Sequence, residues 1–314
     1  MDLIRDIPKI LEENKLILFV IDGLGKAELN IPLRSQIYRT VFPSSTSTFF
    51  YSLASLLEPE EHGFLEWNMR FRDTIVTVPP WITIDGKELT PGEVSRREVF
   101  PFKSLSEILW EKGFSSTIFS PFATSVFTRY SAKKSRRIEI SFLSQIFPLP
   151  DSDFIFIYWP SIDSILHEKG KGECYNAELQ LLSTFINLLW KRIQKGTKLI
   201  ILGDHGLTEV SRRYTLPVIG SIPVGGSRVA FYRGVKKEEV EEELRIPAKV
   251  FHIKEIMKNP VRRCYKNFGE IIVVAKGGAY FRYPWENERS KMAHGGLSRE
   301  EMEIRVWIGE KISR

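Results

Sequence analysis

Three short segments of the chain share one pattern, in which a run of hydrophobic residues ends at, or shortly before, an aspartate. The runs and their aspartates are 15–21 (KLILFVI) with Asp22, 154–158 (FIFIY) with Asp163, and 199–202 (LIIL) with Asp204. Continuous apolar runs of this length, bounded by glycine and proline, are typical of strands buried on both faces of a sheet. The pattern therefore predicts three buried strands.

Segments with helical spacing of apolar residues lie between these runs. They cover residues 47–57, 105–112 and 178–194, and the second of them ends at Gly113, a residue favoured after the last turn of a helix. Strands that alternate with helices predict an α/β fold with a mainly parallel sheet. Ligands of such sheets bind beyond the carboxyl ends of the strands, where all three aspartates are expected.

Residues 211–292 have a different character. They contain Gly-Gly pairs, short alternating strand patterns at 228–232 and 270–275, and a charged helical pattern at 236–244. We therefore predict that residues 1–314 form a single catalytic domain. Within it, 211–292 would form a small α+β insertion, or a lid over the site.

Composition narrows the class of protein. Hydrophobic residues make up 43% of the 314 residues, which excludes a disordered chain, and the net charge of +6 favours anionic partners. The two cysteines, Cys174 and Cys264, form no C-x-x-C pair, so a thiolate zinc site and a disulfide scaffold are both excluded. The N-terminal residues lack the apolar run of a signal peptide, and no run approaches the roughly 20 residues that span a bilayer. We expect a cytoplasmic protein without a membrane partner.

A basic cluster at residues 133–137 (KKSRR) leaves two interpretations open. It is either a solvated loop or a contact for phosphate or nucleic acid. The chain carries no nucleic-acid-binding motif, so nucleic acid is a possible partner that no motif supports. The sequence does not define the oligomeric state.

Histidines accompany the aspartates in a pattern that suits metal binding. The chain has five, namely His62, His167, His205, His252 and His294. Asp163 and His167 are four residues apart and share one face of a helix, Asp204 and His205 are adjacent, and two glycines follow His294. Carboxylate oxygens and imidazole nitrogens without sulfur suit zinc, and also manganese or iron. Six such ligands are enough for two ions about 4 Å apart.

A candidate nucleophile follows the first predicted strand, where hydroxyl residues precede a helix. Residues 40–48 read TVFPSSTST, and Ser44, Ser45 and Thr46 are the rival positions. Such residues are common as helix caps. The N-terminus of a helix also binds anions, and a hydroxyl there that touches a metal would be activated for attack on phosphorus.

Together these segments resemble the alkaline phosphatase superfamily, and within it the type I phosphodiesterase/nucleotide pyrophosphatase family. The resemblance rests on FVIDGLG (19–25), VFPSSTSTFFYSLAS (41–55), PEEHGFLEWN (59–68), DSILH (163–167), LGDHG (202–206) and AHGGLS (293–298), in the family's order. It implies a three-layer α/β/α sandwich and a metal-dependent phosphoester hydrolase. The implied substrate is a small anionic phosphoester or a nucleotide.

The resemblance also implies roles for single residues. One metal, which the nucleophile touches as well, would be held by Asp22, Asp204 and His205, and the other by Asp163, His167 and His294. Thr46 aligns best with the nucleophile. Asn68 is the candidate for holding a phosphate oxygen, although its spacing is one residue off, and the His62-Gly63 turn is structural. The cofactors are two divalent ions, zinc in the first place and manganese as the alternative.

Two departures from the family pattern keep other functions open. Ser55-Leu56-Leu57 stands where the family has Thr-Gly, and HGGLSREEM at 294–302 is similar to the PglZ-type branch found in phage-defence systems. One alternative is a phosphomonoesterase or a relative of the phosphoglycerate mutases. The other is a PglZ-like regulatory or defence module with little turnover. Trp67, Trp81 and Trp159 are either packing residues or surfaces for a nucleobase.

Overall fold

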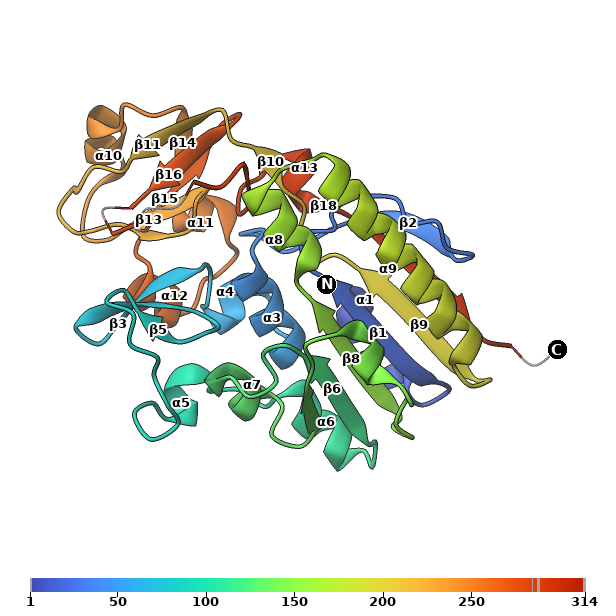
Figure 1. The fold of residues 1–314 in the computed structure, drawn as a ribbon. Coiled ribbons are helices and arrows are strands. Elements are labelled where there is room, and N and C mark those ends of the chain that lie inside the picture. The colour runs from blue at the N-terminus through green and yellow to red at the C-terminus, as the bar shows by residue number, and fades with distance from the viewer. Residues whose placement is uncertain (1, 284, 287–288, 313–314) are drawn as a thin grey trace.

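The computed structural model describes residues 2–283, 285–286 and 289–312, and its main sheet contains all three predicted strands (Figure 1). In spatial order the strands are β2 (Arg34–Arg39), β18 (Glu303–Glu310), β9 (Thr197–Leu202), β1 (Lys15–Ile21), β8 (Phe154–Trp159), β6 (Ser116–Ser120) and β7 (Arg136–Glu139). Strand β18 is antiparallel to both of its neighbours, and every other pair in this sheet is parallel. The predicted mainly parallel sheet is confirmed.

Helices cover both faces of this sheet, because successive side chains of a strand point to opposite sides. In β1, Ile17, Phe19 and Ile21 pack against one layer of helices, and the alternate residues pack against the other layer. The first layer contains α8 (Ser161–Glu168) and α9 (Glu173–Arg192), and α9 lies along the sheet in Figure 1. The second layer contains α1 (Asp2–Arg5), α2 (Ile7–Ile10), α3 (Thr46–Ser55) and α6 (Leu105–Glu111). The result is an α/β/α sandwich, as predicted.

A second, antiparallel sheet stands beside the first. Its strands in spatial order are β14 (Ala248–His252), β15 (Ile271–Ala275), β13 (Val229–Tyr232), β12 (Val224–Gly225), β3 (Asn68–Phe71), β4 (Thr74–Thr77) and β5 (Ile82–Thr83). The strands predicted at 228–232 and 270–275 are β13 and β15, and the charged helix is α10 (Lys237–Glu243). Because β3, β4 and β5 also belong to this sheet, it extends beyond the predicted insertion 211–292. The role of that range as a lid stays a prediction.

The rest of the chain forms two small ladders and several short helices. The ladders pair β10 (Thr208–Glu209) with β17 (Met292–Ala293) and β11 (Arg212–Thr215) with β16 (Ala279–Arg282). The remaining helices are α4 (Pro59–His62), α5 (Arg96–Val99), α7 (Val126–Ser131), α11 (Ile253–Ile256), α12 (Arg262–Asn267), α13 (Arg299–Met302) and the 3₁₀ helix η1 (Leu143–Ile146). Both cysteines are free. Within the described ranges, every helix is too short or too polar to cross a bilayer.

His62 joins α4 to α3, and its burial predicts how the stability of the protein depends on pH. Its imidazole is buried, with Nε2 3.0 Å from Ser52 Oγ, and Nδ1 accepts the Phe64 N–H at 3.0 Å. Burial, together with the charge of Arg263, lowers the pKa of His62 from 6.5 to about 3. The unfolded chain therefore binds a proton at a higher pH than the folded protein does. The stability from neutral His62 is complete above pH 6.5 and is lost as pH falls towards 3.

We expect the free energy of unfolding of His62→Gln to change less with pH between pH 7 and pH 4.5 than that of the wild type. The difference in slope should approach about 1.4 kcal/mol per pH unit, measured by urea denaturation. Ser52→Ala is the control, because it removes a hydrogen-bond partner but keeps the imidazole and hence the pH slope. Equal slopes in His62→Gln and the wild type would contradict the assignment.

Candidate functional site

Three aspartates meet at the carboxyl ends of the central strands β1, β8 and β9. Asp22 follows β1 directly, and its N–H donates to the carbonyl oxygen of Trp159 at 3.0 Å. The N–H of Asp163, in the first turn of α8, donates to the carbonyl oxygen of Asp22 at 3.0 Å. Asp204 follows β9, and its Oδ1 accepts the N–H of Gly23 at 3.0 Å. Backbone contacts therefore fix the positions of the three side chains.

Two glycines permit this close approach of the backbone. Gly23 has φ +70°, and a Cβ atom there would lie 2.8 Å from the Cα of Asp163. Gly295, which follows His294, has φ +118°, and a Cβ atom there would lie 2.6 Å from Glu66 Oε1. Both positions combine a left-handed conformation with a lack of space, so only glycine fits.

Asp22, Asp204 and His205 form one group of candidate metal ligands. One ligand atom from each lies within 4.8 Å of the others. His205 Nε2 is 3.4 Å from Asp22 Oδ1 and 3.4 Å from Asp204 Oδ2. Asp204 Oδ2 is buried and has no hydrogen-bond partner among the described residues. A buried carboxylate oxygen of this kind fits a cation, so the donor set suits the divalent metal that the sequence predicts.

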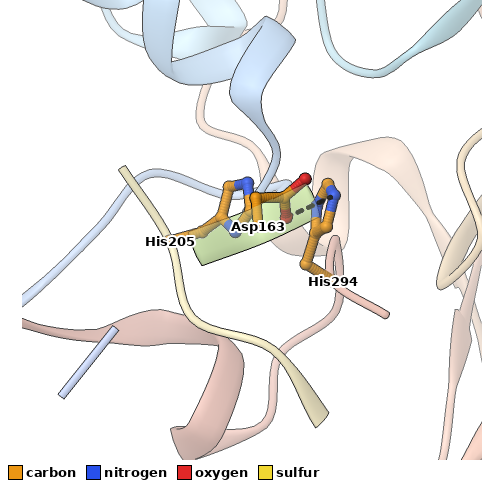
Figure 2. Close-up of side chains that lie close together, drawn as sticks. All are labelled: Asp163, His205 and His294. Carbon is orange, nitrogen blue, oxygen red and sulfur yellow. Dashed lines mark ion pairs between the residues drawn. The ribbon is translucent and has the colours of Figure 1, made fainter. Parts of the chain in front are cut away.

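Asp163, His205 and His294 form a second group, which Figure 2 shows. The rings of His205 and His294 stack with their centroids 3.8 Å apart, and His294 Nε2 lies 3.9 Å from Asp163 Oδ1. His167, the third ligand predicted for this metal, has its Nε2 3.3 Å from the same carboxylate oxygen. The structure thus brings all six predicted ligands together. It also places His205 beside both groups, which the sequence pattern did not indicate.

The charges in this cluster perturb one another. Burial, together with the charges of Asp204 and Asp163, raises the pKa of Asp22 well above its ordinary value. Burial also raises the pKa of Asp204. Burial alone would raise the pKa of Asp163, but His167, His294 and His205 hold that pKa below its usual range. Burial and the neighbouring His205 lower the pKa of His294, which favours the neutral imidazole that binds metals.

Thr46 presents its hydroxyl to the first ligand group. It is the first residue of α3, and its Oγ1 lies 3.0 Å from His205 Nε2 and 3.4 Å from Asp22 Oδ1. The N-terminus of α3 directs free N–H groups and the positive end of the helix dipole towards the same place. A hydroxyl, carboxylates, imidazoles and a helix N-terminus therefore meet at one point.

The other two candidate hydroxyls have structural partners. Ser45 is the N-cap of α3, where its Oγ accepts the N–H of Thr48 at 3.4 Å and lies 2.9 Å from Thr48 Oγ1. Ser44 is fully buried, and its Oγ donates to the carbonyl oxygen of Gly296 at 2.8 Å. Of the three, Thr46 is the residue whose hydroxyl contacts the cluster.

Asn68 begins β3 and is buried. Its Oδ1 accepts from Thr77 Oγ1 at 3.0 Å, and its Nδ2 donates to Glu286 Oε1 at 3.3 Å. The neighbouring Trp67 is 39% exposed and lies near Thr46, whereas Trp81 is fully buried in the core. The amide of Asn68 is therefore engaged within the second sheet.

A buried ion pair that sequence reasoning missed supports the loop of His294. Arg228 Nε and Nη2 donate to Glu301 Oε1 and Oε2 at 3.0 and 3.2 Å, and both side chains are almost fully buried. Glu301 Oε1 also accepts the N–H of Gly296 at 2.8 Å. The pair joins the second sheet to the main sheet, because Arg228 precedes β13 and Glu301 precedes β18. Its only sequence signal was the Ser298–Glu301 capping pattern, which does not point to Arg228.

Comparisons with known proteins identify the family and the fold. Residues 33–297 match the profile of the family described as type I phosphodiesterase/nucleotide pyrophosphatase. No protein with a curated description matches the sequence.

Solved structures share the fold at low sequence identity. Mouse ectonucleotide pyrophosphatase/phosphodiesterase 5, as an inactive variant in complex with AMP, has a TM-score of 0.70 and 17% identity over 94% of this chain and 88% of that chain. The human protein of the same name has a TM-score of 0.69 and 16% identity over 93% and 87%. Phosphonoacetate hydrolase from Sinorhizobium meliloti 1021, in complex with phosphonoacetate, has a TM-score of 0.64 and 12% identity over 95% and 91%. The predicted alkaline phosphatase-like fold is confirmed.

The buried ion pair of Arg228 and Glu301 is expected to contribute to the stability of the fold. We expect Glu301→Ala to lower the free energy of unfolding by about 3 kcal/mol or more, because it leaves the Arg228 guanidinium buried without its partner. The double variant Arg228→Met/Glu301→Leu should be less destabilised than the single variant. Urea denaturation of the wild type, Glu301→Ala, the double variant and its two single variants, Arg228→Met and Glu301→Leu, measures both effects. If the double variant loses as much stability as Arg228→Met and Glu301→Leu added together, the coupling is absent.

The carboxylate cluster makes a prediction about metal binding. We expect Zn²⁺ or Mn²⁺ to stabilise the wild type by about 2.7 kcal/mol at a hundredfold excess over Kd, and Asp22→Asn to lose most of this effect. Without metal, Asp22→Asn should be at least as stable as the wild type, because it removes one of three repelling buried carboxylates. Thermal unfolding with metal and with chelator measures both. The control is Asp151→Asn, an exposed aspartate paired with Lys15. A wild-type response in Asp22→Asn would show that Asp22 is no ligand.

Proposed function

This chain belongs to the type I phosphodiesterase/nucleotide pyrophosphatase family, whose members are metal-dependent phosphoester hydrolases, and from that premise we propose that it cleaves phosphodiesters or nucleotide pyrophosphates through Thr46 and two divalent cations. The carrying observation is the position of the Thr46 hydroxyl, 3.0 Å from His205 Nε2 and 3.4 Å from Asp22 Oδ1. Asp22, Asp204 and His205 would hold one cation, zinc first and manganese as the alternative. Asp163, His167 and His294 would hold the other.

Bound cations would supply positive charge, which would favour the ionised hydroxyl and neutralise the phosphoryl oxygens. Thr46 Oγ1, after its proton has passed to water, attacks phosphorus, and the bond from phosphorus to the leaving oxygen breaks on the opposite side with its electron pair on that oxygen. The phosphoryl group stays as an ester on Thr46 until water hydrolyses it. The N-terminus of α3 stabilises negative charge on the phosphoryl group while it is attached there.

Asn68 is the proposed partner of a phosphoryl oxygen. Its Nδ2 carries two hydrogens, of which one donates to Glu286 Oε1 at 3.3 Å, so the other would donate to the phosphoryl oxygen.

The nucleophile is tested by comparing two neighbouring hydroxyls. We expect Thr46→Ala to lower kcat by a factor on the order of 10³ or more, because the hydroxyls of Ser44 and Ser45 are held by structural partners and the Tyr158 hydroxyl, which donates to Asp22, stays protonated. Ser45→Ala should retain turnover and lose about 1 kcal/mol of stability through its helix cap. The assay uses bis-p-nitrophenyl phosphate, p-nitrophenyl phosphate and p-nitrophenyl thymidine monophosphate, with Zn²⁺ or Mn²⁺ and after chelation.

Each outcome of this assay decides between functions. Metal-dependent turnover that favours the diesters supports the phosphodiesterase. Preference for the monoester would favour the phosphomonoesterase or mutase relative. Bound metal without turnover of any ester would favour the PglZ-like regulatory module, and full activity of Thr46→Ala would refute the nucleophile.

A further inference from the structure

Thr46 is one of the residues that line a cavity of about 490 Å³. Helix α3 forms one wall, strands β6 and β8 form the floor, and helices α6 and α7 and the segment around Pro79 close the other sides. Its volume lies in the range of pockets that bind small molecules. The site of the proposed chemistry is therefore continuous with a space large enough for a substantial part of a substrate.

Hydrocarbon side chains dominate the walls of this cavity. Phe50, Leu53 and Ala54 line it from α3, Ile118 from β6 and Phe156 from β8. Ile118 lies in the middle of its strand between two paired neighbours, yet it is only partly buried. The apolar face of the sheet thus remains open at a place where packing against a helix would normally cover it.

Several polar side chains of the walls already have partners within the protein, and Glu88 lines the cavity as an exposed carboxylate. Ser120 Oγ accepts the N–H of Phe122 at 3.0 Å, and Thr128 Oγ1 donates to the carbonyl oxygen of Phe122 at 2.9 Å. Ser106 Oγ donates to the carbonyl oxygen of Ser131 at 3.1 Å. A polar ligand in the cavity would lose its hydrogen bonds to water and find few replacements, which is costly.

Aromatic residues stand where the cavity meets the catalytic cluster. Phe122 is 53% exposed, and its ring centroid lies 6.1 Å from that of Tyr158. Phe50 packs edge-on against the same tyrosine, with the centroids 4.8 Å apart. Trp67 lies on the rim. The passage from the charged cluster into the cavity is therefore lined by apolar rings.

We propose that this cavity binds an alkyl chain of the phosphoester substrate, so that the enzyme prefers diesters with a hydrocarbon substituent to nucleotides. The proposal rests on the function proposed above, since it assigns the chain a place next to the phosphoryl group at Thr46. An alkyl chain needs no hydrogen-bond partner and gains from leaving water. A nucleobase and its ribose carry donors and acceptors that these walls leave unmatched.

The test compares chain lengths within each protein. We expect kcat/KM for p-nitrophenyl hexyl phosphate to exceed that for p-nitrophenyl methyl phosphate by a factor on the order of 10² or more, from about fourfold for each buried methylene. This hexyl/methyl ratio of kcat/KM should also exceed the ratio of kcat/KM for p-nitrophenyl thymidine monophosphate to kcat/KM for the methyl ester. Ala54→Trp, which fills the cavity, should reduce the hexyl/methyl ratio at least tenfold, and Ile118→Thr should reduce it less. Val218→Trp, at an exposed residue outside the cavity, is the control and should keep the wild-type ratio.

Calorimetric binding separates this proposal from the proposed function. Hexylphosphonate should bind the wild type and Thr46→Ala at least tenfold more tightly than methylphosphonate does, and Ala54→Trp should lose the difference. If no ester is turned over but this preference is found, the cavity assignment stands and the hydrolase proposal fails. If the esters are turned over without dependence on chain length, or the thymidine ester is preferred, the alkyl proposal is overturned and the hydrolase stands. If neither turnover nor the binding preference is found, the alkyl proposal and the hydrolase proposal are both overturned.

Discussion

The mutual repulsion of three buried carboxylates is the constraint around which the site is built. Asp22, Asp163 and Asp204 meet because three adjacent parallel strands end at one edge of the sheet. Burial disfavours their charged forms, and the proximity of like charges adds to this cost. Partial compensation comes from the hydroxyl of Tyr158, which donates to Asp22, from the N–H groups of Gly23 and His205, which donate to Asp204, and from the histidines around Asp163. The fold therefore holds in place a concentration of negative charge that divalent cations would offset.

The loop that follows β17 completes this site with His294. His294 lies between β17 and α13, and its Nδ1 is 3.2 Å from the carbonyl oxygen of Ser44, just before the proposed nucleophile. The ion pair of Arg228 with Glu301 fixes the loop that carries His294, and it spans the two sheets. The same loop therefore contacts both the junction of the two sheets and the second ligand group. A loss of stability at this junction is expected to displace an imidazole from the site.

The sequence predicted the elements whose pattern lies within a short stretch of the chain, and it missed those that depend on contacts between distant segments. The apolar runs before Asp22 and Asp204 defined central strands, and their shared edge followed from the rules of parallel sheets. The helix predicted over 47–57 begins one residue earlier, at Thr46, and the proline and hydroxyl residues before it indicated where it would start. The second sheet was only partly foreseen, because β3 pairs with β12 from a distant part of the chain and short strands carry weak periodicity. The contact of His205 with both ligand groups depends on ring stacking with His294, which no spacing encodes.

Tyr158 contacts both the charged cluster and the apolar cavity. Its hydroxyl donates to Asp22, while its ring packs edge-on against Phe50 in the cavity wall. Burial and the charge of Asp22 raise the pKa of this hydroxyl well above its ordinary value, so it stays protonated and remains a donor. One rigid side chain therefore separates a region that favours cations and phosphoryl oxygens from one that favours hydrocarbon. Under the proposed function, a substrate with both kinds of group would satisfy both regions in one orientation, with its phosphorus beside Thr46.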